Sequence, residues 1–342
     1  MNKIVIASVM PKAGKTTVAL GIATQLSGSI GYMKPLGDNQ IYKKKRLVDY
    51  DAALFRQTFS IEEPIEDFTL GFHHSKIMHA FPDVKQELEA RFNTLSGDKD
   101  FFIVEGSEDL LHGRSLGLDS FSVASHLHAG VVLVLSGDPY DMMDSLDMAQ
   151  TVAAHHDVSI RGAVIDKARD DDLDKIEKTL QAHRIPLLGT LPYLPALDVM
   201  RVRYVADKLF ARVVAGKDGL DKPIKNILIA ALSANQIIRH PDFKKEDKLI
   251  ITGGDRTDVI TASLSDANTS CIILTNNIVP PSNILAKADK GNIPLLSIRP
   301  DTFTAAKKVE DIESIILPDE TDKIEAIKKA AVGLDLQALH QA

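Results

Sequence analysis

Residues 3–17 read KIVIASVMPKAGKTT. The apolar run Lys3–Ser8 has the length and composition of a buried parallel strand. A short loop follows, and an apolar-rich segment from Thr16 to Leu26 predicts a helix directly after it. A buried strand, a tight loop and a helix in this order are typical of the first strand–helix unit of an α/β domain.

The loop ends in Gly14-Lys15-Thr16, as a phosphate-binding P-loop does. Backbone N–H groups at a helix start face phosphate oxygens, and the helix dipole favours the anion there. Lys15 is expected to contact the β- and γ-phosphates and the Thr16 hydroxyl to hold Mg²⁺. The first glycine of the full motif is replaced by Val9, so a plain strand–turn–helix junction is the alternative. The phosphate contacts are assigned to Lys12, Ala13, Gly14, Lys15, Thr16 and Thr17.

Three charged residues lie where further strands of such a sheet end. Glu105 follows the apolar run Phe101–Val104, and Lys34 follows the strand-like Ile30–Met33. In open parallel sheets the carboxyl ends of the strands face the ligand. Asp51, or its neighbour Asp49, begins a predicted helix, for which N-capping is the structural alternative. We predict that Thr16, Asp51 and Glu105 hold the metal ion.

Strand-like and helical segments alternate along the whole chain. This pattern predicts an α/β fold, with a P-loop NTPase-like parallel sheet covered by helices on both faces and a smaller α/β domain after it. The turn-forming residues Gly216–Gly219 mark the boundary, which gives domains 1–215 and 216–342. The end of the chain, Asp319–Leu334, is expected to form a surface helix. Further strands are expected at 131–135, 161–165, 187–191, 227–232, 249–252, 270–275 and 294–298, and further helices at 50–59, 84–92, 138–154 and 170–183.

Composition excludes several classes of protein. The chain has 342 residues and a formal net charge of −7, which does not favour nucleic-acid binding. The basic run Lys43–Arg46 is interpreted as a solvated loop. The single cysteine, Cys271, excludes an intramolecular disulfide and is expected to be buried. No segment reaches the roughly 18 apolar residues of a membrane span, and no leader is recognisable, so a cytoplasmic location is expected.

Together, these segments resemble the dethiobiotin synthetase-like P-loop family. The resemblance implies a Mg²⁺ and ATP site in which Lys15 and Thr16 bind phosphate and metal, Lys34 acts on the transferred group, and Asp51 and Glu105 hold Mg²⁺. Lys15 and Lys34 are thus the candidate catalytic residues. Homodimers are common in that family and are expected here. The resemblance rests on 8–17, 31–35, 49–52, 104–106, 161–167 and 186–192.

The second half resembles another module. Residues 251–258, ITGGDRTD, are similar to the motif of the DRTGG domain. A dethiobiotin synthetase-like domain followed by a DRTGG domain resembles the N-terminal arrangement of long phosphotransacetylases. Their catalytic domain would follow residue 342, so we do not expect acetyl transfer by these residues. Asp255 is a candidate helix cap and Arg256 a candidate anion ligand, with a purely structural turn as the alternative.

Several positions depart from the family pattern. Asp166 replaces an asparagine that lies near the base, which leaves the adenine preference open. Extra acidic residues, Asp38 in one loop and Glu108-Asp109 in another, disfavour a negatively charged substrate, so dethiobiotin synthesis is not expected. Asn276-Asn277 replaces a glycine pair.

These features favour a Mg²⁺–nucleotide-binding protein with a regulatory role. Its partner is expected to be a phosphotransacetylase or another protein. An ATP-dependent ligase or phosphotransferase acting on a small carboxylate is the main alternative, and a dimerisation module with a relic P-loop is the third.

Overall fold

The computed structural model describes residues 1–43, 46–168 and 170–340. Its contacts divide the chain into two compact units, Met1–Leu194 with Ile316–Ala342, and Pro195–Ile315. The predicted boundary at residue 216 therefore lies within the second unit. The reason is that helix α8 (Val202–Lys208) packs into the core of the second unit, and helix α13 (Thr321–Ala330) packs on the first.

The first unit is built on a six-stranded sheet in the order β2-β5-β1-β6-β7-β8. All neighbouring strands are parallel. The predicted parallel sheet is confirmed, and its central strands are buried on both faces, as parallel sheets require. The strands are β1 (Asn2–Ser8), β2 (Ile30–Met33), β5 (Phe101–Glu105), β6 (Gly130–Leu135), β7 (Ile160–Ala168) and β8 (Leu187–Pro192).

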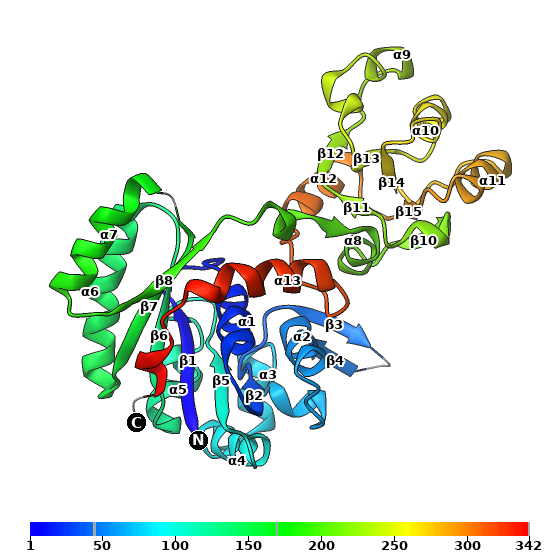
Figure 1. Ribbon diagram of the computed structural model, residues 1–342. Helices are drawn as coiled ribbons and strands as arrows, with labels where there is room; N and C mark the ends of the chain where they lie inside the picture. Colours follow the sequence, from blue (N-terminus) through cyan, green and yellow to red (C-terminus); the bar gives the residue numbers. More distant parts are fainter. Residues whose placement is uncertain (44–45, 169, 341–342) are drawn as a thin grey trace. The chain divides into compact units, whose positions relative to one another are not determined.

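Helices cover both faces of this sheet (Figure 1). Helices α4, α5, α6 and α7 contact one another in sequence and form one layer, whereas α1 and α13 pack together in the other. Helix α2 contacts the edge strand β2. The bounds are α1 (Lys15–Gln25), α2 (Tyr50–Thr58), α4 (Val84–Ser96), α5 (Ser120–Leu127), α6 (Pro139–His156) and α7 (Asp170–Ala182).

Three elements near the site do not follow from the apolar pattern. Strands β3 (Gln40–Lys43) and β4 (Arg46–Asp49) form an antiparallel hairpin, and helix α3 (His74–Ala80) is a short helix after it. The hairpin ends at Asp49, directly before α2. Of the run Lys43–Arg46, predicted as a solvated loop, Lys43 ends β3 and Arg46 begins β4, and residues 44–45 lie outside the described residues.

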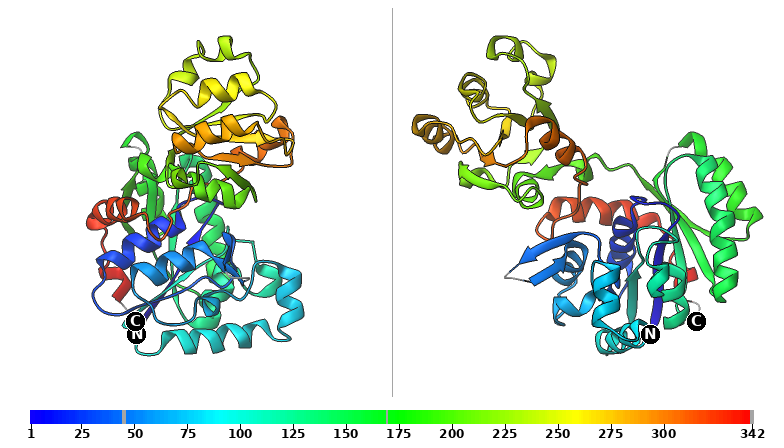
Figure 2. Two further views of the ribbon diagram at one scale, coloured as in Figure 1. Left: turned by 90° about the vertical axis from the view of Figure 1, so that its right-hand side faces the viewer. Right: turned by 180° about the vertical axis from the view of Figure 1, so that it is seen from behind.

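The second unit has its own five-stranded sheet, in the order β10-β15-β14-β13-β12. Alternate side chains of its strands point to opposite faces. Ile250 and Ile272 lie in the core under α9, α10 and α11, whereas Ile251 and Ile273 lie in the core under α8 and α12 (Figures 1 and 2). The strands are β10 (Arg212–Ala215), β12 (Asn226–Ile229), β13 (Lys248–Gly253), β14 (Thr269–Thr275) and β15 (Leu295–Ser297), and a small ladder joins β9 (Met200–Arg201) to β11 (Pro223–Ile224). The helices are α9 (Ala234–Ile237), α10 (Thr257–Ser263), α11 (Ser282–Lys290) and α12 (Thr302–Glu310).

The C-terminal helix α13 is a surface helix, as expected, and it buries one face. Lys323 and Ile327 of α13 are buried, and Lys323 Nζ lies 3.0 Å from a Glu320 carboxylate oxygen. Helix α13 packs on α1, where Gly21 leaves room for the side chains of Ile327 and Ala331. One face of this surface helix therefore contributes to the core of the first unit. Among the described residues, no helix is long and apolar enough to cross a membrane.

Cys271 tests the packing of the second unit. Its side chain is 0 % exposed in strand β14, as predicted, and burial raises the pKa of its thiol. We expect the native protein to react with Ellman's reagent at least about 100-fold more slowly than free cysteine, because the reaction needs an exposed thiolate. Denaturant should restore one rapidly reacting thiol. Fast reaction in the native state would contradict this core.

Candidate nucleotide and metal site

The loop between β1 and α1 has the backbone of a phosphate-binding turn. Gly14 caps helix α1 in the left-handed region, with φ 95°, and Lys12 has φ 61°. Val9, where the full motif has glycine, does not appear among the described residues with positive φ. A valine is therefore tolerated there, whereas Gly14 is required because its conformation is strained for residues with a Cβ.

Lys15 is held inside the site by two acceptors. Its Nζ donates to Ser8 Oγ and to the Glu108 carbonyl oxygen, both at 2.9 Å. Ser8 Oγ donates to the same carbonyl at 3.1 Å. Burial lowers the pKa of Lys15, and Glu105 opposes this effect. The end of β1 and the loop after β5 thus each supply one neutral oxygen to the lysine, where phosphate oxygens would bind it.

Thr16 and Glu105 meet at the carboxyl edge of the sheet. Thr16 Oγ1 donates to Glu105 Oε1 at 2.8 Å, and the Tyr32 hydroxyl donates to the other carboxylate oxygen, Oε2, at 2.9 Å. The Tyr32 ring stacks on Phe55 of α2 at a centroid distance of 3.9 Å. Burial raises the pKa of Tyr32 well above its usual value, and Glu105 adds to this rise. The tyrosine therefore stays a donor that orients Glu105.

Asp49 and Asp51 divide the two roles that the sequence left open. Asp49 is the N-cap of α2: its Oδ1 accepts from the Asp51 and Ala52 N–H groups at 2.9 and 3.3 Å. Its Oδ2 accepts from two further N–H groups, of Asp38 and Asn39, both at 3.2 Å. Asp51 is buried but does not cap the helix, so its carboxylate is directed to the site.

The Lys34 ammonium lies among four carboxylates. It makes a short contact with Asp51 Oδ2 and lies 2.5 Å from Asp38 Oδ1, 3.4 Å from Glu105 Oε1 and 4.0 Å from Asp49 Oδ1. Burial by itself lowers the pKa of Lys34, but the surrounding carboxylates outweigh it and raise that pKa well above its usual value. Burial raises the pKa values of Asp49 and Glu105, and Lys34 opposes both shifts.

The oxygen donors at this edge fit a magnesium ion. Mg²⁺ prefers hard oxygen ligands in an octahedron with metal–oxygen distances of about 2.1 Å, so adjacent ligands lie about 3 Å apart. The 2.8 Å between Thr16 Oγ1 and Glu105 Oε1 matches that spacing. Among the described residues, Asp38, Asp49 and Asp51 also bring one carboxylate oxygen each within 4.8 Å of one another.

Asp166 lies against the P-loop rather than in open solvent. It is 3 % exposed at the carboxyl end of β7, and a Cβ added at Gly14 would meet its Oδ2 at 1.9 Å. Burial raises the pKa of Asp166 to about 6. The next residue, Lys167, donates from Nζ to the Lys12 carbonyl at 3.3 Å. The Asp166 carboxylate therefore lies directly against Gly14, and a side chain at position 14 would collide with it. This is a second reason for glycine there.

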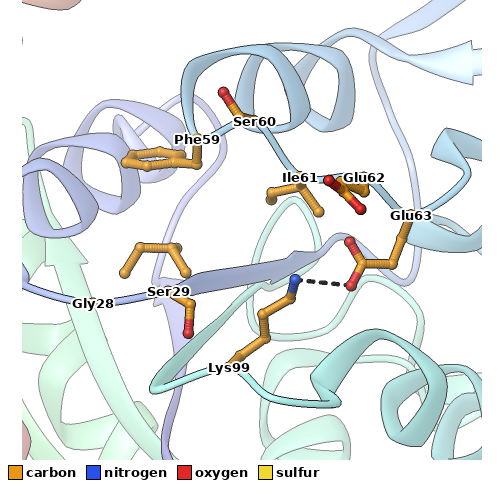
Figure 3. Close-up of a pocket in the computed structure, with 9 residues that line it drawn as sticks. Gly28, Ser29, Phe59, Ser60, Ile61, Glu62, Glu63 and Lys99 are labelled. Atoms are coloured by element: carbon orange, nitrogen blue, oxygen red, sulfur yellow. Dashed lines mark ion pairs between the residues drawn. The ribbon is translucent and has the colours of Figure 1, made fainter.

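Two pockets of the first unit differ in their relation to this site. A pocket of about 430 Å³ is lined by His74 and by the loop after β5, whose Glu108 carbonyl binds Lys15. A larger one, about 590 Å³, lies where β2 and β5 begin, with Lys99 paired to Glu63 at 2.8 Å (Figure 3). The P-loop follows the carboxyl end of β1, and all these strands are parallel. The larger pocket therefore lies at the amino ends of the strands, away from the P-loop.

In the second unit, the Gly253–Thr257 turn is stabilised within its own fold. A Cβ at Gly254 would meet the Ile278 carbonyl at 1.9 Å, and Arg256 donates to the Leu232 carbonyl at 2.8 Å. Arg256 is the N-cap of α10, without a side-chain cap bond, so Asp255 does not cap the helix. The structure thus favours the structural interpretation of this turn. Asn276 and Asn277 both have positive φ, 62° and 54°, which glycine and asparagine tolerate.

The structure brings together the five residues predicted for the site chemistry: Lys15, Thr16, Lys34, Asp51 and Glu105. The sequence did not indicate a role there for the side chains of Ser8 or Tyr32, and it named Asp49 only as the alternative to Asp51. Asp38 was interpreted as a repulsive charge, but it pairs with Lys34. Tyr32 lies inside an apolar strand, and nothing in that pattern distinguishes it from a core aromatic.

The pKa of Asp166 predicts a pH-dependent stability. A carboxyl whose pKa is higher in the folded than in the unfolded state destabilises the protein above that folded pKa. We expect Asp166→Asn to raise the free energy of unfolding by about 1–3 kcal/mol at pH 7, because the pKa rises by about 2. The gain should vanish near pH 4. Urea titrations at pH 4 and 7 measure it, and an equal effect at both would contradict the burial argument.

Comparison with protein families gives two matches. The model of the AAA domain matches residues 2–201, and that of the DRTGG domain matches residues 204–312. The predicted pairing of a P-loop domain with a DRTGG domain is confirmed.

Curated relatives include the phosphate acetyltransferases of Pseudomonas aeruginosa and Synechocystis sp. The first is 23% identical over 357 residues, covering 96% of this chain and 50% of that protein. The second is 24% identical over 335 residues, covering 92% and 47%. The chain thus spans about half the length of the curated relatives it matches.

Similar solved structures include a putative plasmid partition protein from Borrelia burgdorferi bound to AMPPNP. That similarity has a TM-score of 0.38 at 11% identity and covers 58% of this chain and 89% of that one. The two family models match residues 2–201 and 204–312 of the chain. By the match over residues 2–201, the chain belongs to the AAA domain family, and a DRTGG domain follows in it.

Proposed function

We propose that the first unit binds a Mg²⁺–nucleotide, with ATP as the nucleotide, and that this binding regulates acyl-phosphate metabolism of the phosphotransacetylase type. The observation that carries the binding is the convergence of Lys15, Thr16, Asp51 and Glu105 on one edge of the sheet. A P-loop, a hydroxyl and two carboxylates are the groups that a metal–nucleotide needs.

In this proposal, neutral hydrogen-bond acceptors position Lys15 before phosphate binds. The Lys15 ammonium exchanges Ser8 Oγ and the Glu108 carbonyl for phosphate oxygens, which are stronger acceptors. Tyr32 holds Glu105 in place during the exchange. Thr16, Asp51 and Glu105 would hold Mg²⁺, which neutralises charge on the phosphates when bound. Asp166, at the end of β7, lies against Gly14, and we expect this residue to influence base preference.

The regulatory part of the proposal rests on similarity. Curated relatives that this chain matches are phosphate acetyltransferases, and the chain carries a DRTGG domain in addition to its P-loop domain. We propose a phosphotransacetylase-type enzyme as the protein partner and a homodimer as the assembly.

A second candidate function is supported by the pocket of about 430 Å³. The pocket contains Arg114, His74 and His112, and the ring centroids of the two histidines lie 5.2 Å apart. Arg114 Nη1 lies 3.5 Å from His156 Nε2, and no described carboxylate pairs with it. The Arg114 guanidinium would suit a carboxylate awaiting phosphorylation, in a pocket that Glu108 and Asp109 also line. This arrangement fits an ATP-dependent ligase or phosphotransferase.

Nucleotide binding is tested with Lys15→Ala. In thermal-shift and calorimetric titrations we expect wild type to be stabilised by Mg-ATP, by about 2.7 kcal/mol at a hundredfold excess over Kd. Lys15→Ala should bind about 10- to 100-fold more weakly, because a charge-assisted contact to phosphate is lost. Lys85→Ala, an exposed lysine of α4, is the matched control and should bind as wild type does. No shift with ATP, GTP or ADP would reject a working P-loop.

Phosphate release separates the two functions. A regulatory protein should bind Mg-ATP without turnover above background. The second candidate instead predicts turnover that a small carboxylate stimulates, that Lys15→Ala abolishes and that Arg114→Ala reduces at unchanged ATP affinity. A steady-state phosphate assay with a panel of carboxylates measures this, and stimulated turnover would replace the regulatory proposal by the enzymatic one.

A further inference from the structure

The Lys34 ammonium stands where the predicted metal ligands meet. Thr16 Oγ1 and Lys34 Nζ both face the same oxygen, Glu105 Oε1, at 2.8 and 3.4 Å. Lys34 also contacts Asp51, the other carboxylate predicted to hold Mg²⁺. Two of the three predicted metal ligands therefore already surround a cation that belongs to the chain itself.

The lysine reaches this place from a fixed backbone. It directly follows β2, its N–H donates to the Phe68 carbonyl at 2.9 Å, and Pro35 follows it. The side chain is 1 % exposed. Its ammonium can therefore change partners by side-chain rotation without movement of the backbone.

The charges of the cluster do not balance. Asp38, Asp49, Asp51 and Glu105 supply four negative charges, whereas Lys34 and Lys15 supply two positive ones. The formal net charge of the cluster is therefore −2, which one divalent cation would neutralise. Yet a divalent ion bound directly to Asp51 and Glu105 would lie against the Lys34 ammonium, and two cations at that distance in a buried site repel each other strongly.

We propose that Lys34 is a tethered cation that occupies the divalent-metal position in the nucleotide-free protein and has to leave it before Mg²⁺ can bind. A buried ammonium that leaves its carboxylates needs another anion. The phosphates of a nucleotide, at the P-loop, would supply one. This inference rests on the proposed nucleotide site, and it adds a rule of order: metal enters with the nucleotide and not alone.

The rule has a thermodynamic consequence. If nucleotide is what releases Lys34 from Asp51 and Glu105, then nucleotide raises the affinity for the metal, and the metal raises the affinity for nucleotide by the same factor. Lys34 is in this role a positioning residue that couples two ligands. Without nucleotide, Mg²⁺ has to compete with the Lys34 ammonium and therefore binds weakly.

The test is direct metal binding by the full chain without nucleotide. Mn²⁺ replaces Mg²⁺ as the probe, and the free ion is counted by electron paramagnetic resonance. Wild type should bind Mn²⁺ weakly alone and at least about tenfold more tightly with ATP, once the Mn²⁺ that ATP binds in a protein-free blank is subtracted. Lys34→Met should bind Mn²⁺ alone at least about tenfold more tightly than wild type, because a competing charge is removed. Lys34→Arg keeps the competing charge and should not gain this affinity for Mn²⁺ alone.

A second variant guards against loss of folding, since removing one partner of a buried charge cluster is strongly destabilising. Lys34→Met with Asp38→Asn removes one charge of each sign and leaves Thr16, Asp51 and Glu105 intact. It should also gain affinity for Mn²⁺, whereas Asp38→Asn alone should not. If the folded double variant binds Mn²⁺ no better than wild type, or wild type alone already binds it as tightly as with ATP, the inference is wrong.

These outcomes are separable from those of the nucleotide proposal. Failure of wild type to bind ATP would reject the proposed function, but the Lys34 variants would still report on the metal position without any nucleotide. Conversely, ATP binding that Lys15→Ala weakens, with no change in Mn²⁺ affinity in the Lys34 variants, would reject only the tethered-cation role.

Discussion

The organisation of the first unit depends on one buried group of charges, the Lys34 ammonium and the carboxylates around it. Uncompensated buried charges are strongly destabilising, so this lysine can be buried only if its partners are held close. Those partners come from different parts of the chain: Glu105 ends β5, Asp51 belongs to α2, and Asp38 lies in the loop before β3. The contacts of the Lys34 ammonium therefore hold the ends of β2 and β5, the loop before the β3–β4 hairpin and helix α2 together at one edge of the sheet.

The same requirement explains the supporting contacts. Asp49 uses both carboxylate oxygens on backbone N–H groups, which fixes the start of α2 and with it Asp51. Tyr32 fixes Glu105 from β2 and is itself fixed by stacking on Phe55. Asp49 thus orients Asp51, and Tyr32 orients Glu105, the two carboxylates predicted to hold the metal. Such support determines whether a site is preorganised or has to be ordered by its ligand.

The P-loop shows which motif positions the backbone needs. Lys12 and Gly14 adopt positive φ, and the Gly14 position is doubly restricted because Asp166 lies against it. The first motif position needs no such conformation here, and valine occupies it. In the second unit the Gly253–Thr257 turn follows the same logic. Gly254 passes so close to the Ile278 carbonyl that no side chain fits, and Arg256 ties the turn to a neighbouring loop.

The sequence alone determined the fold class, most strands of the two sheets, the P-loop and the candidate residues Lys15, Thr16, Lys34, Asp51 and Glu105. It could do so because apolar runs and local turn chemistry are properties of neighbouring residues, and because strands of a parallel sheet end at a common edge. The family resemblance added the roles of Lys34, Asp51 and Glu105.

Only the tertiary structure decided which groups share the site, because contacts between residues 16 and 105, or 34 and 51, depend on how distant segments pack. It showed that Asp49 rather than Asp51 caps α2, that Asp38 pairs with Lys34, and that the domain division falls near residue 194 instead of 216. It also buried one face of α13, whose polar sequence indicated a surface helix. Pairing and burial of charges are set by distances across the fold, and a linear pattern of residues carries no such distances.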